Sequence, residues 1–171
     1  MSIVLVGYRG SGKSTIGKQL AERLAYPFVD VDDLIVADAG KSIKDIFAEE
    51  GEPVFRDIET RAIQRVAALS EHVIGLGGGS LGREENRRAI AKSGHRVVYL
   101  KCEPAELHRR IRSDPQSTLT RPNLTSLGGG IEEIEQMLSR REPLYRELMT
   151  AELDVTKLTP EEAVNRIIRM L

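Results

Sequence analysis

The residues with the clearest chemical signature form a loop near the start of the chain, Gly7-Tyr8-Arg9-Gly10-Ser11-Gly12-Lys13-Ser14. They match the pattern G-x-x-x-x-G-K-[ST], which binds nucleotide phosphates when it lies between a strand and a helix. Glycines in such a loop let main-chain N–H groups and the positive end of the next helix face a triphosphate. If the segment were only a ligand-free glycine turn, its eight positions and its flanking strand and helix would match the P-loop pattern by chance. We therefore expect this P-loop to bind a nucleotide through Gly10, Ser11, Gly12, Lys13, Ser14 and Thr15.

Lys13 is expected to neutralise the β- and γ-phosphates, and the Ser14 hydroxyl is expected to bind Mg²⁺. Asp30 and Asp32 lie at the carboxyl end of the second predicted strand, at the sheet edge where open α/β folds bind ligands. Alternation along an extended strand predicts that both carboxylates face the P-loop. One acid can hold the metal, for which we take Asp30, while Asp32 orients an attacking hydroxyl and accepts its proton. The alternative, an N-capping aspartate in a solvated loop, fits Asp33 best.

The acceptor of the phosphate has to be inferred from other residues. Gly77-Gly78-Gly79 follows the third predicted strand at the same sheet edge, where bare backbone can approach a ligand, although a plain flexible turn has the same composition. The guanidinium group binds carboxylates and phosphates in a bidentate manner. The candidate arginines are Arg56, Arg121 and Arg141, which composition alone would not distinguish from surface arginines.

Composition limits the other possibilities. The net charge of -1, from 25 basic and 26 acidic residues, argues against a nucleic-acid or membrane surface built on bulk charge. The single cysteine, Cys102, cannot form an internal disulfide, and three scattered histidines do not propose a metal site. No signal-peptide pattern or bilayer-length apolar run is visible. We expect a cytoplasmic monomer.

Short β-branched runs alternate with longer amphipathic runs, which is typical of a parallel sheet covered by helices. With 171 residues and 40% hydrophobic content, the chain can bury one core, so we expect a single domain over residues 1–171. Strands are predicted at Ile3–Val6, Phe28–Val31, Val73–Leu76, Val97–Leu100 and Leu153–Val155. Helices are predicted at Ser14–Leu24, from Pro53 to Leu69, and from Thr159-Pro160 to the C-terminus.

Two segments interrupt this alternation. Residues of about 32–60 include short helices near Gly40 and Gly51, and they form an insertion that could close over a substrate. Residues of about 113–130 are rich in Ser, Thr, Asn, Pro and Gly, which predicts a lid with Arg121 as its candidate functional residue.

Taken in chain order, these motifs resemble the shikimate kinase family. The P-loop is generic, but the later motifs in this order are specific to that family. The segments that carry the resemblance span nearly the whole chain: residues 7–15, Phe28-Val29-Asp30-Val31-Asp32, Ile46-Phe47, Gly51-Glu52, Phe55-Arg56 with Glu59, Gly77-Gly78-Gly79, Arg121-Pro122 and Arg141-x-Pro143-Leu144-Tyr145.

The resemblance implies a three-layer α/β sandwich of the P-loop NTPase fold, with a five-stranded parallel sheet in the order 2-3-1-4-5. It implies transfer of the ATP γ-phosphate to the 3-hydroxyl of shikimate, with Mg²⁺, in chorismate and aromatic amino acid biosynthesis. Shikimate would be bound by Asp32, Arg56, Gly77, Gly78, Gly79 and Arg141, with the two arginines on its carboxylate. Arg121 would close with the lid onto the transferring phosphate, and Arg110 would flank the adenine.

One departure from the family pattern is Asn123-Leu124 after Arg-Pro, where two leucines are frequent, together with Gly128-Gly129-Gly130. We expect it to alter lid dynamics or nucleotide affinity rather than abolish activity. The alternatives are a gluconate kinase, a nucleoside-monophosphate kinase and, from another class, a nucleotide-dependent switch or bare ATPase. The guanine-specific Asn-Lys-x-Asp pattern is absent, which disfavours a GTPase.

Overall fold

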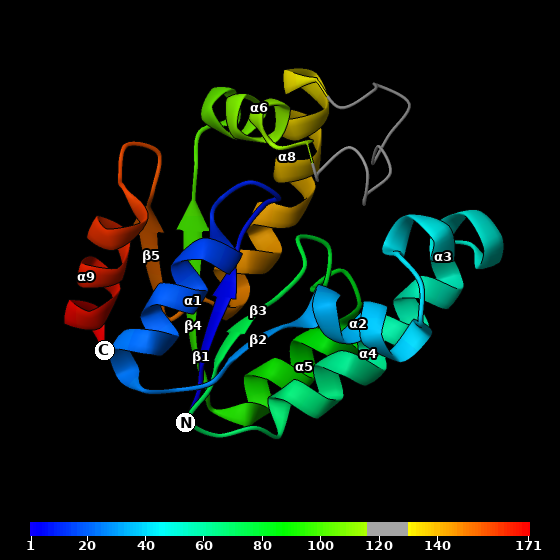
Figure 1. Cartoon of the computed structure of the whole chain (residues 1–171), viewed down its shortest axis with the longest axis horizontal. Coiled ribbons are helices and arrows are strands. Elements are labelled where there is room, and N and C mark those ends of the chain that lie inside the picture. The colour runs from blue at the N-terminus through cyan, green and yellow to red at the C-terminus, as the bar shows by residue number, and fades with distance from the viewer. Residues whose placement is uncertain (116–129) are drawn as a thin grey trace.

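The computed structural model in Figure 1 describes residues 1–115 and 130–171. Its centre is a five-stranded sheet in the order β2-β3-β1-β4-β5, with every neighbouring pair parallel. This architecture and strand order confirm the predicted fold class. The strands are β1 (Ile3–Val6), β2 (Phe28–Asp30), β3 (Val73–Gly75), β4 (Arg96–Lys101) and β5 (Ala151–Asp154).

Helices cover both faces of the sheet and give the fold its three layers (Figure 1). On one face α1 (Lys13–Leu24) packs against α9 (Pro160–Met170). On the other, α8 (Ile131–Leu148) contacts β4, and α5 (Glu84–Ser93) lies between α8 and α4 (Glu52–Ala67). The remaining helices are α2 (Val31–Ala39), α3 (Ile43–Glu50) and α6 (Pro104–Ser113).

The core is centred on β1, whose four residues are all buried because neighbouring strands and both helical layers surround it. Val4 and Leu5 have no exposed surface, and the buried apolar residues form one cluster. A strand covered on both faces is apolar at every position rather than at alternate ones, which explains the continuous Ile-Val-Leu-Val run. Its rigid carboxyl end carries the P-loop.

The second strand is shorter than predicted, and this changes the basis for one inference. It ends at Asp30, and Val31 already begins α2, because the Asp30 side chain caps that helix by accepting a hydrogen bond from the Asp32 main-chain nitrogen at 2.9 Å. Asp32 therefore lies in the first turn of a helix, and the argument from strand alternation was wrong. The helix turn still directs Asp32 to the cavity that Asp30 lines.

The other elements lie close to their predicted ranges. The third strand ends one residue early, the fourth is one residue longer at each end, and the fifth starts two residues earlier and ends one earlier. The last helix begins as its sequence predicts, because Thr159 and Glu162 form a reciprocal capping box and Pro160 is the first helical residue. This cap fixes the loop that precedes α9.

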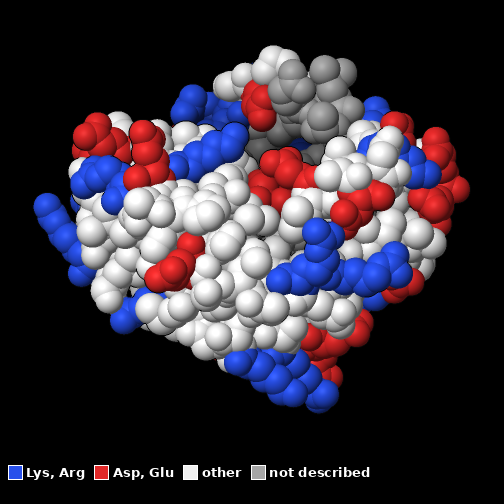
Figure 2. Space-filling model, turned by 60° about the horizontal axis from the view of Figure 1, so that its bottom comes forward, with Lys and Arg blue, Asp and Glu red and all other residues white. Residues whose placement is uncertain are grey.

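The predicted insertion of about 32–60 spans α2, α3 and the start of α4, with Gly40 and Gly51 as the helix-ending residues. Most of the predicted lid lies outside the described residues, as do Arg121 and Asn123. In the described ranges no helix has the length and apolar character that crossing a bilayer requires. Basic and acidic side chains are interspersed on the face shown in Figure 2, and neither sign of charge dominates that face.

Candidate active site

The P-loop joins β1 to α1 and holds a backbone conformation that depends on glycine. Gly7 has φ +153°, and a Cβ there would lie 2.8 Å from the Leu100 carbonyl oxygen and from the Ser11 Oγ. A side chain at this position would therefore push the loop away from β4. The Lys13 ammonium donates hydrogen bonds to the carbonyl oxygens of Gly7 at 2.7 Å and Tyr8 at 3.0 Å, which holds it over the loop.

Three of the predicted site residues are connected beside the P-loop. The Ser14 hydroxyl donates to Asp30 Oδ2 at 2.8 Å, while Asp30 Oδ1 accepts from the main-chain nitrogen of Asp32 at 2.9 Å. The structure thus brings Ser14 and Asp30 together as a pair of oxygen ligands of the kind that Mg²⁺ prefers. Within residues 1–115 and 130–171, no cluster of three or more His, Cys, Asp or Glu side chains could hold a metal unaided.

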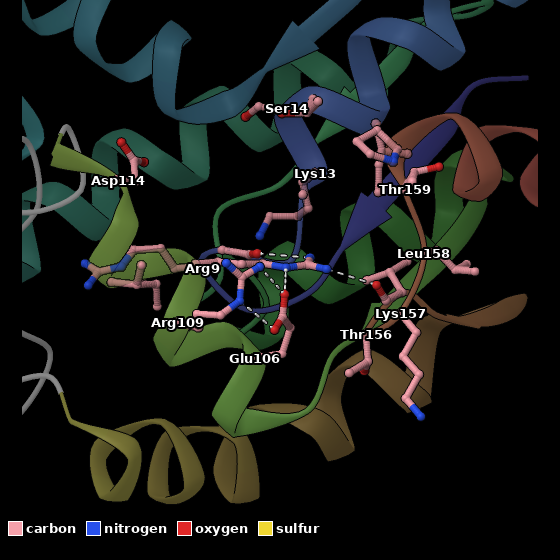
Figure 3. Close-up of a pocket in the computed structure, with 18 of the residues that line it drawn as sticks. Arg9, Lys13, Ser14, Glu106, Arg109, Asp114, Thr156, Lys157, Leu158 and Thr159 are labelled. Atoms are coloured by element: carbon pink, nitrogen blue, oxygen red, sulfur yellow. Dashed lines mark hydrogen bonds and ion pairs between the residues drawn. The ribbon is translucent and has the colours of Figure 1, made fainter.

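A cavity of about 740 Å³ opens above the P-loop (Figure 3). Its volume falls in the range of pockets that bind cofactor-sized ligands. Of the predicted nucleotide residues, it is lined by Gly10, Gly12, Lys13, Ser14, Thr15 and Arg110. Ser11 does not line the cavity, since its side chain is fully buried and its main-chain nitrogen donates to the Tyr8 carbonyl oxygen. Arg121 lies outside the described residues.

The far wall of the cavity consists of α6 and the loop between β5 and α9 (Figure 3). Arg110 bridges these parts, with Nη2 donating to the Val155 carbonyl oxygen at 3.0 Å and Nη1 lying 3.5 Å from the carbonyl oxygens of Gly10 and Ser11. Glu106 accepts from Arg110 Nε at 2.9 Å and from Arg109 at 2.7 and 2.9 Å. These hydrogen bonds lower the pKa of the Glu106 carboxyl to about 2.

A second pocket adjoins the first one. It is lined by Arg9, Asp32, Ile43, Phe47, Phe55, Arg56, Glu59, Gly77, Gly78, Gly79 and Arg141. A Cβ on Gly79 would lie 2.9 Å from Arg56 Nη2 and 3.0 Å from Arg141 Nη2, so the two guanidinium groups converge on this glycine. A side chain at position 79 would therefore displace one or both guanidinium groups. A Cβ on Gly77 would lie 2.9 Å from Asp32 Oδ1, which brings the carboxylate to the same loop.

Arg56 is held by a buried carboxylate. Its Nη1 donates to Glu59 Oε1 at 2.8 Å and to the Gly79 carbonyl oxygen at 3.3 Å, and Glu59 Oε2 accepts from the Ser80 hydroxyl at 2.9 Å. Glu59 is only 1% exposed. Burial raises the pKa of its carboxyl, and the nearby Arg56 charge and the hydrogen bonds oppose that rise. Glu59 thus fixes the direction in which Arg56 points.

Helix α8 contributes Arg141 and its support. The Arg141 guanidinium lies over the Tyr8 ring at 5.7 Å from its centroid, so a P-loop residue packs against an arginine of the second pocket. One turn further along α8, the Tyr145 hydroxyl donates to the Gly78 carbonyl oxygen at 2.6 Å. Burial raises the pKa of the Tyr145 phenol, so this group remains a protonated donor at neutral pH. Phe47 and Phe55, whose centroids are 4.7 Å apart, supply an apolar wall.

The structure therefore brings Asp32, Arg56, Gly77, Gly78, Gly79 and Arg141 into one pocket beside the P-loop cavity. Sequence reasoning did not select several residues that line these cavities. The loop after β5 could have been identified as a cavity wall, since it follows a strand at the ligand-binding edge of the sheet. For Arg9 the signal was a charged residue inside the P-loop itself. The lining residues not selected include Arg9, Glu106, Arg109, Ile43, Phe47, Phe55 and Glu59.

The chain is similar to known proteins over nearly its whole length. The family model for shikimate kinase matches residues 9–171 of the chain. The shikimate kinase of Rhodopirellula baltica is 42% identical over 167 residues, which are 98% of this chain and 88% of that protein. That of Symbiobacterium thermophilum is 40% identical over 171 residues, or 100% of this chain and 96% of the relative. Among solved structures, the shikimate kinase from Acinetobacter baumannii in complex with shikimate superposes with a TM-score of 0.91 at 30% identity, covering 99% of this chain and 91% of its own.

Proposed function

Because this chain belongs to the shikimate kinase family, we propose that it phosphorylates shikimate with ATP. In the proposed reaction the 3-hydroxyl oxygen attacks the γ-phosphorus, its proton passes to Asp32, and ADP leaves with the electron pair of the broken bond. The products are shikimate 3-phosphate and ADP, in the route to chorismate and the aromatic amino acids.

The observation that carries this proposal is the convergence of Arg56 and Arg141 on Gly79, in a pocket that shares Asp32 with the P-loop cavity. A carboxylate bound by two guanidinium forks would fix one end of a small acid. Its hydroxyl groups would then lie near Asp32 and the nucleotide cavity. Since phosphoryl transfer depends mainly on alignment and charge stabilisation, this adjacency is what the reaction requires.

Mg²⁺ belongs to the proposal as well. The paired oxygens of Ser14 and Asp30 suit a small hard cation, and the phosphates of ATP with water would complete its shell. When bound, the ion neutralises charge on the phosphates. Among the residues of the chain itself, Lys13 adds a positive charge at the P-loop, and Gly10, Gly12 and Thr15 line the phosphate site.

Two arginines complete the proposed assignment. Arg110, fixed between the P-loop and the loop after β5, would lie against the adenine ring. Arg121 is assigned to the transferring phosphate, within a lid of about 113–130, from its sequence context alone.

We further propose that the enzyme acts as a monomer. Its proposed location is the cytoplasm, where ATP is available and the buried free thiol of Cys102 would stay reduced.

The direct test is ADP release by purified protein in Mg-ATP, measured with shikimate, with gluconate, with a nucleoside monophosphate and with no acceptor. We expect release to depend on shikimate. Equal ADP release without any acceptor would identify a bare ATPase, and release that required gluconate or the nucleotide would assign the acceptor pocket to another substrate.

A further inference from the structure

Arg9 and Asp32 line both the cavity above the P-loop and the second pocket. These two spaces are called the P-loop cavity and the acceptor pocket. The boundary between these cavities is where the acceptor oxygen, the phosphorus and the leaving oxygen of ADP would lie in line. Asp32 has an assigned role there as the proton acceptor. Arg9, the third residue of the P-loop, does not.

The position of Arg9 is fixed by the surrounding structure. Its main-chain nitrogen lies 3.6 Å from where a Cβ on Gly78 would be, so the P-loop and the triple glycine are in close approach at this point. The preceding residue, Tyr8, is buried under the Arg141 guanidinium. The Nε and Nη1 atoms of Arg9 are shielded from solvent, which strengthens any electrostatic interaction that the side chain makes. Figure 3 shows Arg9 in the wall of the same cavity as Lys13.

We propose that Arg9 is a further catalytic residue, which binds the equatorial oxygens of the phosphoryl group as it moves from ADP to the acceptor. The inference rests on the proposed function. In the transfer the bond from the γ-phosphorus to the ADP oxygen breaks, and a bond to the acceptor 3-oxygen forms as its proton moves to Asp32. Negative charge is then spread over oxygens that would lie at the boundary of the two cavities, where the Arg9 guanidinium would bind them through Nη2, because its Nε and Nη1 are shielded.

This role differs from those of the neighbouring cations. Arg56 and Arg141 line the acceptor pocket but not the P-loop cavity, while Lys13 lines the P-loop cavity but not the acceptor pocket. A cation at the boundary between the cavities attracts the phosphoryl group most strongly in the transition state, when negative charge develops between donor and acceptor. Because it lies on the P-loop, Arg9 would supply this charge from the body of the domain.

The test compares the wild-type enzyme with Arg9→Met, Arg9→Lys and the control Arg88→Met. Arg88 is an exposed residue of α5, paired with Glu84, and lines neither cavity. We expect Arg9→Met to lower kcat by roughly tenfold to a hundredfold. The KM for shikimate and the affinity for ADP, measured by calorimetry, should change by less than about threefold. Arg9→Lys should show a smaller loss of kcat, and Arg88→Met none.

A second readout separates phosphoryl binding from a structural role. Aluminium fluoride, added to the protein with Mg-ADP and shikimate, imitates the group in transfer. We expect this addition to raise the melting temperature of the wild type and Arg88→Met further, above the value with Mg-ADP and shikimate alone, but to give no further rise in Arg9→Met. Arg9→Lys retains the charge and serves as the test variant if Arg9→Met fails to fold, with a reduced kcat and a weaker aluminium fluoride response expected. A kcat within about threefold of wild type in both Arg9 variants, or an effect confined to the KM for shikimate, would overturn the proposal. If the wild type itself shows no shikimate-dependent ADP release, the proposed function has failed instead.

Discussion

The hydroxyl of Tyr145 on α8 donates a 2.6 Å hydrogen bond to the carbonyl oxygen of Gly78, so the helix that carries Arg141 also holds the loop on which the two pocket arginines converge. The Arg-x-Pro-Leu-Tyr motif thus contributes both a binding arginine and the support for its binding site. Residues four apart on a helix lie on the same face, which explains this spacing.

Replacing Tyr145 with Phe should leave the Gly78 carbonyl without this donor and loosen the glycine loop. We expect the KM for shikimate to rise roughly threefold to tenfold, with the KM for ATP unchanged, as the loss of one hydrogen bond would give. Steady-state kinetics with each substrate varied would measure this. The matched control is Tyr99→Phe, because the Tyr99 ring packs against Tyr145 but its hydroxyl donates to Glu142 and not to the loop. Equal effects in both variants would contradict the positioning role.

Replacing Arg141 with Ala should remove half of the proposed carboxylate clamp. A charge-assisted hydrogen bond contributes about 1.5–3 kcal/mol, so the KM for shikimate should rise roughly tenfold to a hundredfold while that for ATP changes little. Arg140→Ala is the control, since that neighbouring side chain is exposed and lines neither pocket. Unchanged acceptor binding in Arg141→Ala would remove this residue from the clamp.

Replacing Asp32 with Asn should remove the proposed proton acceptor while preserving the helix. The Asp30 cap binds the main-chain nitrogen at position 32, so it is insensitive to the exchange. General-base loss predicts that kcat falls by about 10²–10⁴ while nucleotide affinity stays nearly constant. Single-turnover measurements with Asp33→Asn as the control would check this, and a wild-type rate in Asp32→Asn would exclude the base role.

Replacing Glu106 with Gln should weaken the binding of ATP and leave the binding of shikimate unchanged. Glu106 fixes Arg110 and Arg109 as a carboxylate, with its pKa lowered to about 2, so the neutral amide weakens both contacts. We expect the KM for ATP to rise roughly threefold to tenfold, and that for shikimate to stay constant. Glu103→Gln, at the exposed start of α6, provides the comparison. A parallel change in both Michaelis constants would show that Glu106 does not act through the nucleotide site.

His95 should make the folded state sensitive to mild acid. It is 8% exposed, and burial lowers the pKa of its imidazole, while the carbonyls of Val66 and Ala67 oppose the shift and the N-terminal ammonium adds to it. Between pH 6.5, the ordinary pKa of histidine, and the lowered pKa in the folded state, the unfolded chain therefore binds more protons at His95 than the folded chain does. The contribution of neutral His95 is complete above pH 6.5 and is lost as the pH falls toward the lowered value, by up to about 1.4 kcal/mol per pH unit.

Urea unfolding of the wild type and of His95→Gln at pH 7.5 and pH 5.5 would measure this contribution. The free energy of unfolding should drop more for the wild type than for the variant. An identical drop in both proteins would show that another group carries the acid sensitivity.

The P-loop and the capping box at Thr159 could be predicted because each depends on a local pattern with one structural solution, whereas the strand order was implied only by the resemblance to the shikimate kinase family. The inference from strand alternation at Asp32 failed because helix capping by Asp30 competes with an extended backbone, and nothing within Phe28-Val29-Asp30-Val31-Asp32 decides between them. Arg9 and Glu106 were missed for another reason. Their importance comes from cavities that only the packed chain creates, between segments about 100 residues apart.

One carboxylate oxygen of Asp30 accepts a hydrogen bond from the Ser14 hydroxyl, and the other accepts one from the main-chain nitrogen of Asp32 in the first turn of α2. A cation bound by Ser14 and Asp30 would act on the same carboxylate that caps the helix of Asp32, the proposed proton acceptor. Binding of Mg-ATP at the P-loop would thereby be linked, through the Asp30 side chain, to the position of Asp32 in the pocket proposed for shikimate. The two substrates should consequently bind with thermodynamic synergy, each raising the affinity for the other by an equal factor.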